Sequence, residues 1–214
     1  MQKQITIVDY GLGNLFSVRR IFSHLECGVQ LATTPEQIEN AEFLVLPGVG
    51  AFKKGMQELQ QRNLIPALKA YAKSGKSILG ICLGMQLLFE CSEENGITEG
   101  LGLISGKVVK IVSDQPSIKI PHIGWSKLKI NSLHAKADIF KDINGKFAYF
   151  VHSYHPIPSQ TDLLATTHYC GQTIHAMVMK DNIMGCQFHP EKSGSNLIPF
   201  LQHCILGHFT AANV

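Results

Sequence analysis

One cysteine stands where a buried strand is expected to run into a helix. Cys82 is at the centre of the segment Gly80-Ile81-Cys82-Leu83-Gly84, which has the G-x-nucleophile-x-G pattern of a tight strand-to-helix turn. Such a turn strains its central residue and projects that side chain, and flanking glycines avoid the clash of Cβ atoms. The pattern predicts Cys82 as a nucleophile and the Leu83 N–H as a donor to an oxyanion. A small apolar cysteine on a Gly-rich strand exit is the alternative interpretation.

A nucleophilic cysteine usually works with a histidine base, and one of the ten histidines is well placed for that role. His189 follows an expected strand in the segment Gln-Phe-His-Pro-Glu at residues 187–191, where a loop can carry catalytic groups. Glu191 can lie on the same side and hold the imidazole tautomer, as a carboxylate does in a triad. Taken singly, each residue has an alternative interpretation: His189 as an ordinary histidine at the end of a strand, and Glu191 as a carboxylate on the surface. Together with Cys82 they predict a Cys-His-Glu triad.

The remaining histidines give no metal-binding pattern. His152 and His155 lie in the segment His-Ser-Tyr-His-Pro, which can form a loop beside a site. The sequence has no H-x-x-x-H or H-E-x-x-H spacing of the kind that binds zinc. We therefore expect neither a metal nor a cofactor.

Composition excludes several classes of protein. The 214 residues are 45% hydrophobic and 16% charged, which is too apolar for a disordered chain. The net charge of +3 comes without a run of Lys or Arg, so we expect no nucleic-acid partner. No apolar stretch reaches the length of a membrane span, the N-terminus does not look like a secretion signal, and the six cysteines show no C-x-x-C spacing. These features predict a cytoplasmic protein.

The elements that must position the triad have an α/β pattern. Strands expected over residues 5–8, 43–46 and 77–81 alternate with helical patterns over residues 15–25, 64–72 and 85–89. This alternation predicts a mostly parallel sheet with helices on both faces. The second half predicts an antiparallel region and a closing helix: strands over residues 108–112, 147–151, 163–167, 174–179 and 183–188, and a helix over 193–206. With no linker or repeat, residues 1–214 are expected to form one domain.

Residues 80–86 and 189–191 together resemble the class I, or triad, glutamine amidotransferases. Four further segments narrow the resemblance to the glutaminase subunits of imidazole glycerol phosphate synthase, an enzyme of histidine biosynthesis. These segments are residues 9–14, 46–52, 121–125 and 149–154. The resemblance covers nearly the whole chain in order, and it implies a single flavodoxin-like glutamine amidotransferase domain.

The resemblance implies a reaction and a partner. Cys82 attacks the side-chain amide of glutamine, His189 passes the thiol proton to the leaving ammonia, and Glu191 orients His189. Water then hydrolyses the glutamyl thioester to glutamate. The ammonia passes by a sealed route to a barrel-shaped cyclase subunit in a heterodimer, which makes imidazole glycerol phosphate and releases an aminoimidazole carboxamide ribotide.

Further residues take implied roles from the same resemblance. Contacts to glutamine are implied for Gly50, Gln86, Glu94, Ser153 and Tyr154. Residues 47–50 correspond to an oxyanion strand, in which glycines on both sides of Val49 permit a peptide flip. The flip would bring the Val49 N–H into the oxyanion hole beside that of Leu83. Without the flip one oxyanion donor is missing, and a lone subunit would have almost no glutaminase activity. A plain turn that uses Pro and Gly for geometry is the alternative.

Four residues are implied to face the cyclase: Asn14, His122, Trp125 and Tyr149. The alternative for the two aromatic residues, Trp125 and Tyr149, is a place in the core. Two departures from the family leave the partner open. Ser126 follows Trp125 where the family often has Asn, and Lys53 and Lys54 replace small or acidic residues.

Three alternative functions remain at this point. A paralogous glutaminase could feed ammonia to the amination or amidination of a surface sugar, with the same triad and another partner. A noncatalytic subunit could keep the fold, although Cys82, His189 and Glu191 are all present. A cysteine protease could use a similar turn, but the segments around Gln86 and Ser153 argue against it.

Overall fold

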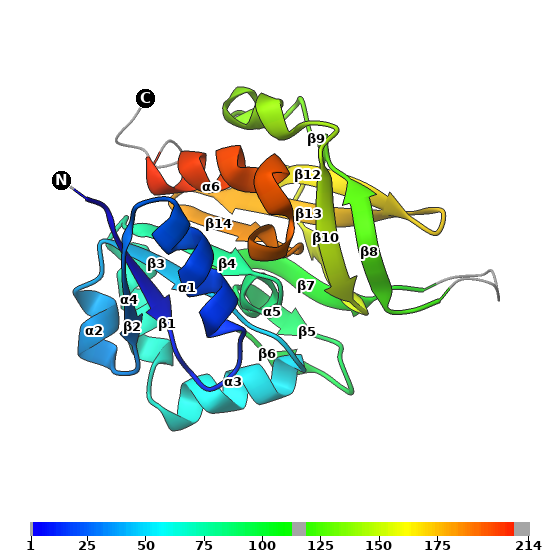
Figure 1. The fold of residues 1–214 in the computed structure, drawn as a ribbon. Coiled ribbons are helices and arrows are strands. Elements are labelled where there is room, and N and C mark those ends of the chain that lie inside the picture. The colour runs from blue at the N-terminus through cyan, green and yellow to red at the C-terminus, as the bar shows by residue number, and fades with distance from the viewer. Residues whose placement is uncertain (1, 113–118, 208–214) are drawn as a thin grey trace.

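The computed structural model describes residues 2–112 and 119–207, whose strands form three sheets (Figure 1). The largest sheet has eight strands in the order β2-β1-β3-β4-β14-β13-β12-β9. Their bounds in that order are Gly28–Ala32, Gln4–Val8, Phe43–Leu46, Ser77–Ile81, Ile183–Cys186, Gln172–Lys180, Leu163–Tyr169 and Lys129–Ile130. Neighbours from β2 to β14 run parallel, and those from β14 to β9 run antiparallel. The expected mostly parallel sheet with an antiparallel region is confirmed.

Helices cover both faces of the parallel half, and its strands are apolar on both sides for that reason. In β3, Phe43 and Val45 belong to one buried cluster, whereas Leu44 and Leu46 belong to the other. Helices α1 (Leu15–His24) and α6 (Ile198–Ile205) pack into the first cluster. Helices α2 (Pro35–Glu39), α3 (Phe52–Gln61) and α4 (Ile65–Lys73) pack into the second. Among the described residues, no helix has the length and hydropathy needed to cross a membrane.

Two smaller sheets meet at the segment around residue 153. One has the strand order β11-β7-β5-β6, with bounds Tyr154–Pro158, Ile104–Lys110, Phe89–Ser92 and Thr98–Glu99. The other pairs β10 (Phe147–His152) with β8 (His122–Lys127). Ser153 therefore lies at the junction between β10 and β11, where the chain passes from one small sheet to the other. Short 3₁₀ helices, η1 to η3, span Ala137–Ile143, Pro190–Lys192 and Gly194–Leu197.

Several expected elements differ from the observed ones. The helix expected over 85–89 is wrong in extent: α5 spans Leu83–Leu87, and Phe89 begins β5. A short apolar run fits a buried helix or a buried strand equally well, so periodicity could not separate them. The closing helix expected from 193 begins at Ile198 after η3, because Pro199 lacks an N–H and suits only a first turn.

The strands expected over 108–112 and 183–188 are shifted or shorter. The first is β7, Ile104–Lys110, and the second is β14, which ends at Cys186. Helix α3 and the strands β2, β6, β8, β9 and β11 have no counterpart in the expectations. The exposed middle of β2 lacks a clear alternating pattern, and α3 has no side-chain cap of its own.

Gly84 allows the turn after β4 to lie directly against the end of β3. A Cβ atom at this position would lie 1.7 Å from the carbonyl oxygen of Leu46, and the main chain cannot accommodate it. We therefore expect Gly84→Ala to lower the free energy of unfolding by about 1–3 kcal/mol, measured by equilibrium unfolding in urea.

Gly75→Asn is the control for this measurement. Gly75 has a φ of 79°, and a Cβ atom at this position would have no neighbour within 4 Å. Asparagine tolerates the left-handed region that this φ requires, so the stability should change little. Equal losses in the two variants would contradict the steric explanation.

Candidate active site

Cys82 occupies a strained turn between β4 and α5. Its φ is 55° and its ψ is −111°, a combination that typically costs about 1–3 kcal/mol in a residue other than glycine. The Cys82 N–H donates to the carbonyl of Cys186 at 2.8 Å. A Cβ at Gly80 would lie 2.8 Å from the main chain of Met85. The predicted turn and its need for glycine are both observed.

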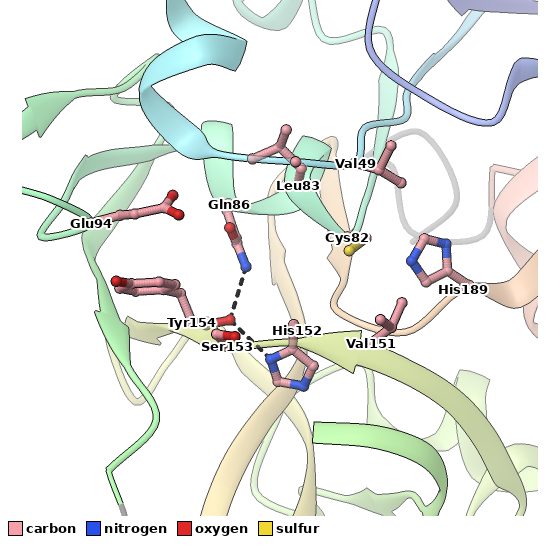
Figure 2. Close-up of a pocket in the computed structure, with 11 residues that line it drawn as sticks. Val49, Cys82, Leu83, Gln86, Glu94, Val151, His152, Ser153, Tyr154 and His189 are labelled. Carbon is pink, nitrogen blue, oxygen red and sulfur yellow. Dashed lines mark hydrogen bonds between the residues drawn. The ribbon is translucent and has the colours of Figure 1, made fainter. Parts of the chain in front are cut away.

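The His189 imidazole is held from one side by Glu191. Nδ1 of His189 lies 2.7 Å from Oε1 of Glu191, and the two side chains are 2% and 1% exposed. The His189 N–H donates to the carbonyl of Tyr149 at 2.9 Å, and the Ser193 hydroxyl donates to the His189 carbonyl at 2.7 Å. These bonds fix the loop after β14, so that the imidazole and Cys82 line one pocket (Figure 2).

The charge of the His189 imidazole depends on its two neighbours. Burial lowers the pKa of His189, but the nearby Cys82 and the hydrogen-bonded Glu191 outweigh burial and raise the pKa to about 10. The imidazole is therefore protonated at neutral pH. Nε2 of His189 is buried without a hydrogen-bond partner among the described residues, which leaves this atom available to exchange a proton with a reacting group.

The pocket has a volume of about 370 Å³, enough for a small amino acid. Most of the predicted site residues meet in it, and Glu191 lies behind His189. Its lining consists of Val49, Gly50, Cys82, Leu83, Gln86, Glu94, Val151, His152, Ser153, Tyr154 and His189.

Two of the predicted glutamine contacts also hold the pocket together. Nε2 of Gln86 donates to the carbonyl of Tyr154 and to Oε1 of Gln187, each at 2.9 Å. Oε2 of Glu94 accepts the N–H of Phe52 at 2.7 Å and so caps the start of α3. Glu94 thereby connects the pocket to the helix that follows residues 47–50.

Neither predicted oxyanion donor is presented to the pocket in this structure. The Leu83 N–H donates to the carbonyl of Gly48 at 3.3 Å. In a trans peptide the N–H points opposite to the C=O, so the Val49 N–H is directed away from that position. Upstream, the Tyr10 hydroxyl holds the Pro47 carbonyl at 2.8 Å, whereas Gly50 has a φ of 106° and open space around it.

The residues expected to face a partner have different surroundings. Trp125 is 52% exposed and meets the Tyr149 ring edge-on at 5.8 Å, so a core position for Trp125 is excluded. Exposed Asn14 caps α1 by accepting the Ser17 N–H at 3.2 Å. His122 requires a correction: it is 1% exposed, because its ring packs between those of Phe150 and Tyr169, and its side chain does not reach the surface of this chain.

Gln187 belongs to the site but is missing from the sequence-based expectations. It is completely buried, and its Nε2 donates to Sγ of Cys82 at 3.7 Å. Val151 and His152 also line the pocket. The available signal for Gln187 was its place in the same short segment as His189, two residues before it.

The geometry predicts a high titration point for His189. We expect its imidazole to remain protonated across the neutral range and to lose its proton near pH 10, where the ion pair with Glu191 is lost. In Glu191→Gln the carboxylate charge is gone while burial remains, so the His189 pKa should fall by about one unit or more. Titration of the ¹⁵N-labelled imidazole by NMR measures both values.

Asp142→Asn is the matched control, since it removes the carboxylate that lies 3.1 Å from His203. The titration of His189 should be the same in this variant as in the unaltered chain. A His189 pKa that does not move in Glu191→Gln would show that the carboxylate does not support the charge.

The chain is similar to proteins of one known family. A profile of the family "Glutamine amidotransferase class-I" matches residues 6–202. The imidazole glycerol phosphate synthase subunit HisH 1 of Legionella pneumophila (strain Lens) is 48% identical over 208 residues, which cover 92% of this chain and 96% of that protein. The subunit HisH of Prochlorococcus marinus (strain MIT 9211) is 44% identical over 196 residues, covering 92% and 91%.

Solved structures show the same fold at low sequence identity. PurLQS from Thermotoga maritima superposes with a TM-score of 0.73 at 17% identity, covering 97% of this chain and 99% of that chain. A glutamine amidotransferase from Thermotoga maritima superposes with a TM-score of 0.61 at 15% identity, covering 94% and 82%.

Proposed function

Because this chain belongs to the class I glutamine amidotransferase family, we propose that it is the glutaminase subunit of an imidazole glycerol phosphate synthase. The chain is thus a glutamine amidotransferase that serves histidine biosynthesis. The observation that carries the proposal is the single pocket shared by Cys82, His189, Gln86 and Glu94. Nucleophile, base and polar groups for an amino-acid substrate meet there.

The reaction follows from the positions of Cys82 and His189. His189 takes the thiol proton of Cys82, the sulfur attacks the side-chain amide carbon of glutamine, and the resulting imidazolium gives that proton to the leaving nitrogen. Ammonia departs and a glutamyl thioester remains on Cys82. His189 then takes a proton from water, the water oxygen displaces the sulfur, and glutamate leaves. Glu191 keeps the imidazole in one orientation through both steps, and no cofactor takes part.

We place the glutamine substrate between the nucleophile and the opposite wall of the pocket. The Glu94 carboxylate is suited to the α-ammonium group, since charge-assisted hydrogen bonds are among the strongest. Gly50, Gln86, Ser153 and Tyr154 supply the remaining polar contacts in this arrangement. Their places in the lining of the pocket support that role.

The Gly48–Val49 peptide is proposed to control the oxyanion hole. In the present conformation the Gly48 carbonyl accepts the Leu83 N–H, and the Val49 N–H is directed the other way. Neither proposed donor can therefore stabilise a tetrahedral intermediate. Rotation of this peptide would release the Leu83 N–H and turn the Val49 N–H toward the same position. Loss of one such donor costs about 10²–10³ in rate, so the unrotated chain should be nearly silent.

The partner is proposed to be a cyclase subunit shaped as a barrel, joined to this chain as a heterodimer, with residues 1–214 acting as one domain. Free ammonia is protonated in neutral water and loses its nucleophilicity, so direct transfer between subunits is required. The exposed Trp125 beside Tyr149 offers the kind of aromatic anchor that interfaces favour. Asn14, at the start of α1, is proposed to lie in the same interface.

The proposal predicts a glutaminase that depends on its partner. We expect the purified chain to release glutamate slowly and the complex with the histidine-pathway cyclase and its nucleotide ligand to release it at least about 10²-fold faster. An assay of glutamate release from glutamine measures both rates. Cys82→Ala should abolish the activity in either setting.

Other outcomes of this assay discriminate among the functions. Stimulation by a surface-sugar synthetase, in place of the cyclase, would keep the triad and refute the assigned pathway. No release of glutamate with either partner would refute the catalytic proposal. Activity that survives in Cys82→Ala would exclude Cys82 as the nucleophile.

Glu94 provides a separate prediction on substrate binding. Glu94→Gln keeps an oxygen to cap α3 but loses the charge that would meet the substrate ammonium. We expect KM for glutamine to rise by about tenfold or more, while the free energy of unfolding changes by less than about 0.5 kcal/mol. Steady-state kinetics of the complex and urea unfolding measure the two effects.

Glu90→Gln is the control for Glu94, because Oε2 of Glu90 also accepts a main-chain N–H, that of Gly106 at 2.9 Å. This residue does not line the pocket, so KM should stay unchanged. An unchanged KM in Glu94→Gln as well would place the ammonium site elsewhere.

A further inference from the structure

A buried chain of hydrogen bonds runs from the Cys82 sulfur to strand β8, and one main-chain carbonyl stands in its middle. The oxygen of Tyr154 accepts from Nε2 of Gln86 at 2.9 Å and from Nδ1 of His152 at 2.9 Å (Figure 2). A carbonyl oxygen can only accept. Both neighbours must therefore present an N–H to it, and this requirement passes along the chain in both directions.

On the side of the nucleophile, the requirement sets the orientation of two amides. The amide group that Gln86 turns toward Tyr154 must be its NH₂, and the same NH₂ lies 2.9 Å from Gln187. Gln187 must then turn its oxygen toward Gln86 and its own NH₂ toward Sγ of Cys82, at 3.7 Å. An N–H donor thus reaches the sulfur.

On the other side, the same carbonyl sets two histidine tautomers. His152 carries its proton on Nδ1, so its Nε2 is an acceptor. This Nε2 lies 3.0 Å from Nδ1 of His122, which must carry the proton of that ring. Nε2 of His122 is left to accept from the hydroxyl of Ser126 at 2.9 Å. Every bond of the chain then has a donor and an acceptor.

The surroundings of the two histidines keep them neutral. Burial lowers the pKa of His152 to about 3 and that of His122 to about 4. The His122 ring stacks between Phe150 and Tyr169, with centroid distances of 4.7 and 3.9 Å. A second proton on His152 would place its Nε2–H against the Nδ1–H of His122, so the neutral state of His152 and these tautomers belong together.

We propose that Gln187 is a positioning residue whose NH₂ group is directed at the Cys82 sulfur by the Tyr154 carbonyl, through Gln86. The hydrogen-bonded chain His152–His122–Ser126 holds that carbonyl from the side opposite to Gln86. The kinetic part of this inference rests on the proposed glutaminase function. An N–H donor stabilises the sulfur whenever it carries negative charge, before attack and again as it leaves the thioester. An oxygen in the same place would repel it.

The tautomers test the polarity of the chain without any variant or activity. Long-range ¹H–¹⁵N correlation spectra of the unaltered chain near pH 7 distinguish protonated from unprotonated ring nitrogens. We expect both His122 and His152 to be neutral with the proton on Nδ1. A proton on Nε2 of His152 would reverse the chain and overturn the inference.

Two variants of Gln187 test the donor to the sulfur. Gln187→Glu keeps the shape and the acceptor toward Gln86 but replaces the NH₂ by oxygen, and Gln187→Met keeps only the length. In the complex with the cyclase we expect kcat to fall about tenfold or more in both, with KM for glutamine within twofold. Wild-type kcat in Gln187→Glu would show that only the acceptor matters and would overturn the inference.

Alkylation of Cys82 separates this inference from the proposed function. Iodoacetamide reacts with the sulfur without glutamine or partner, and mass spectrometry of the peptide that contains Cys82 gives its rate. We expect the rate to fall about tenfold in Gln187→Met, even if glutamine proves not to be the substrate. An unchanged rate in a variant with wild-type unfolding behaviour would overturn the inference.

Gln30→Met is the matched control for both measurements. Gln30 also donates through Nε2, to the Thr6 hydroxyl at 2.9 Å, but it lies on the edge strand β2 outside the pocket. Its kinetics and its Cys82 alkylation should equal those of the unaltered chain. A loss as large as that in Gln187→Met would show a general effect of removing a bonded amide and would overturn the inference.

Discussion

The site depends on the main-chain conformation of Cys82, which has a φ of 55° and a ψ of −111°. Strand β14 accepts its N–H through Cys186, and two glycines let α5 approach β3 and β4 without Cβ atoms between them. The packing of the sheet core therefore offsets the conformational cost of this turn.

The parallel half of the fold could be predicted because its information is local. The runs at residues 5–8, 43–46 and 77–81 are continuous and apolar, and all three are strands of the large sheet. Elements that depend on distant partners were harder to predict. Strand β5 exists because it pairs with β7, and helix α3 is capped from outside by Glu94, 42 residues further along the chain.

The same distinction applies to the site. Cys82, His189 and Glu191 could be predicted because a tight turn and a two-residue spacing are properties of short segments. The role of Gln187 at the sulfur could not, because its partners Gln86 and Cys82 are 101 and 105 residues away in the sequence. The interior position of His122 likewise follows from the register of β8 against β10, which pairs it directly with His152. No local pattern records that register.

The carbonyl of Gly48 accepts the Leu83 N–H and so competes with the substrate oxygen for the oxyanion position. Because this carbonyl belongs to the chain, dilution cannot remove it. Without a partner, glutamine itself must displace the carbonyl at every turnover. Its removal needs only the rotation of one peptide about two main-chain bonds, a local motion that is fast compared with typical turnover. A partner that favours the rotated form therefore raises the fraction of time for which the site is competent.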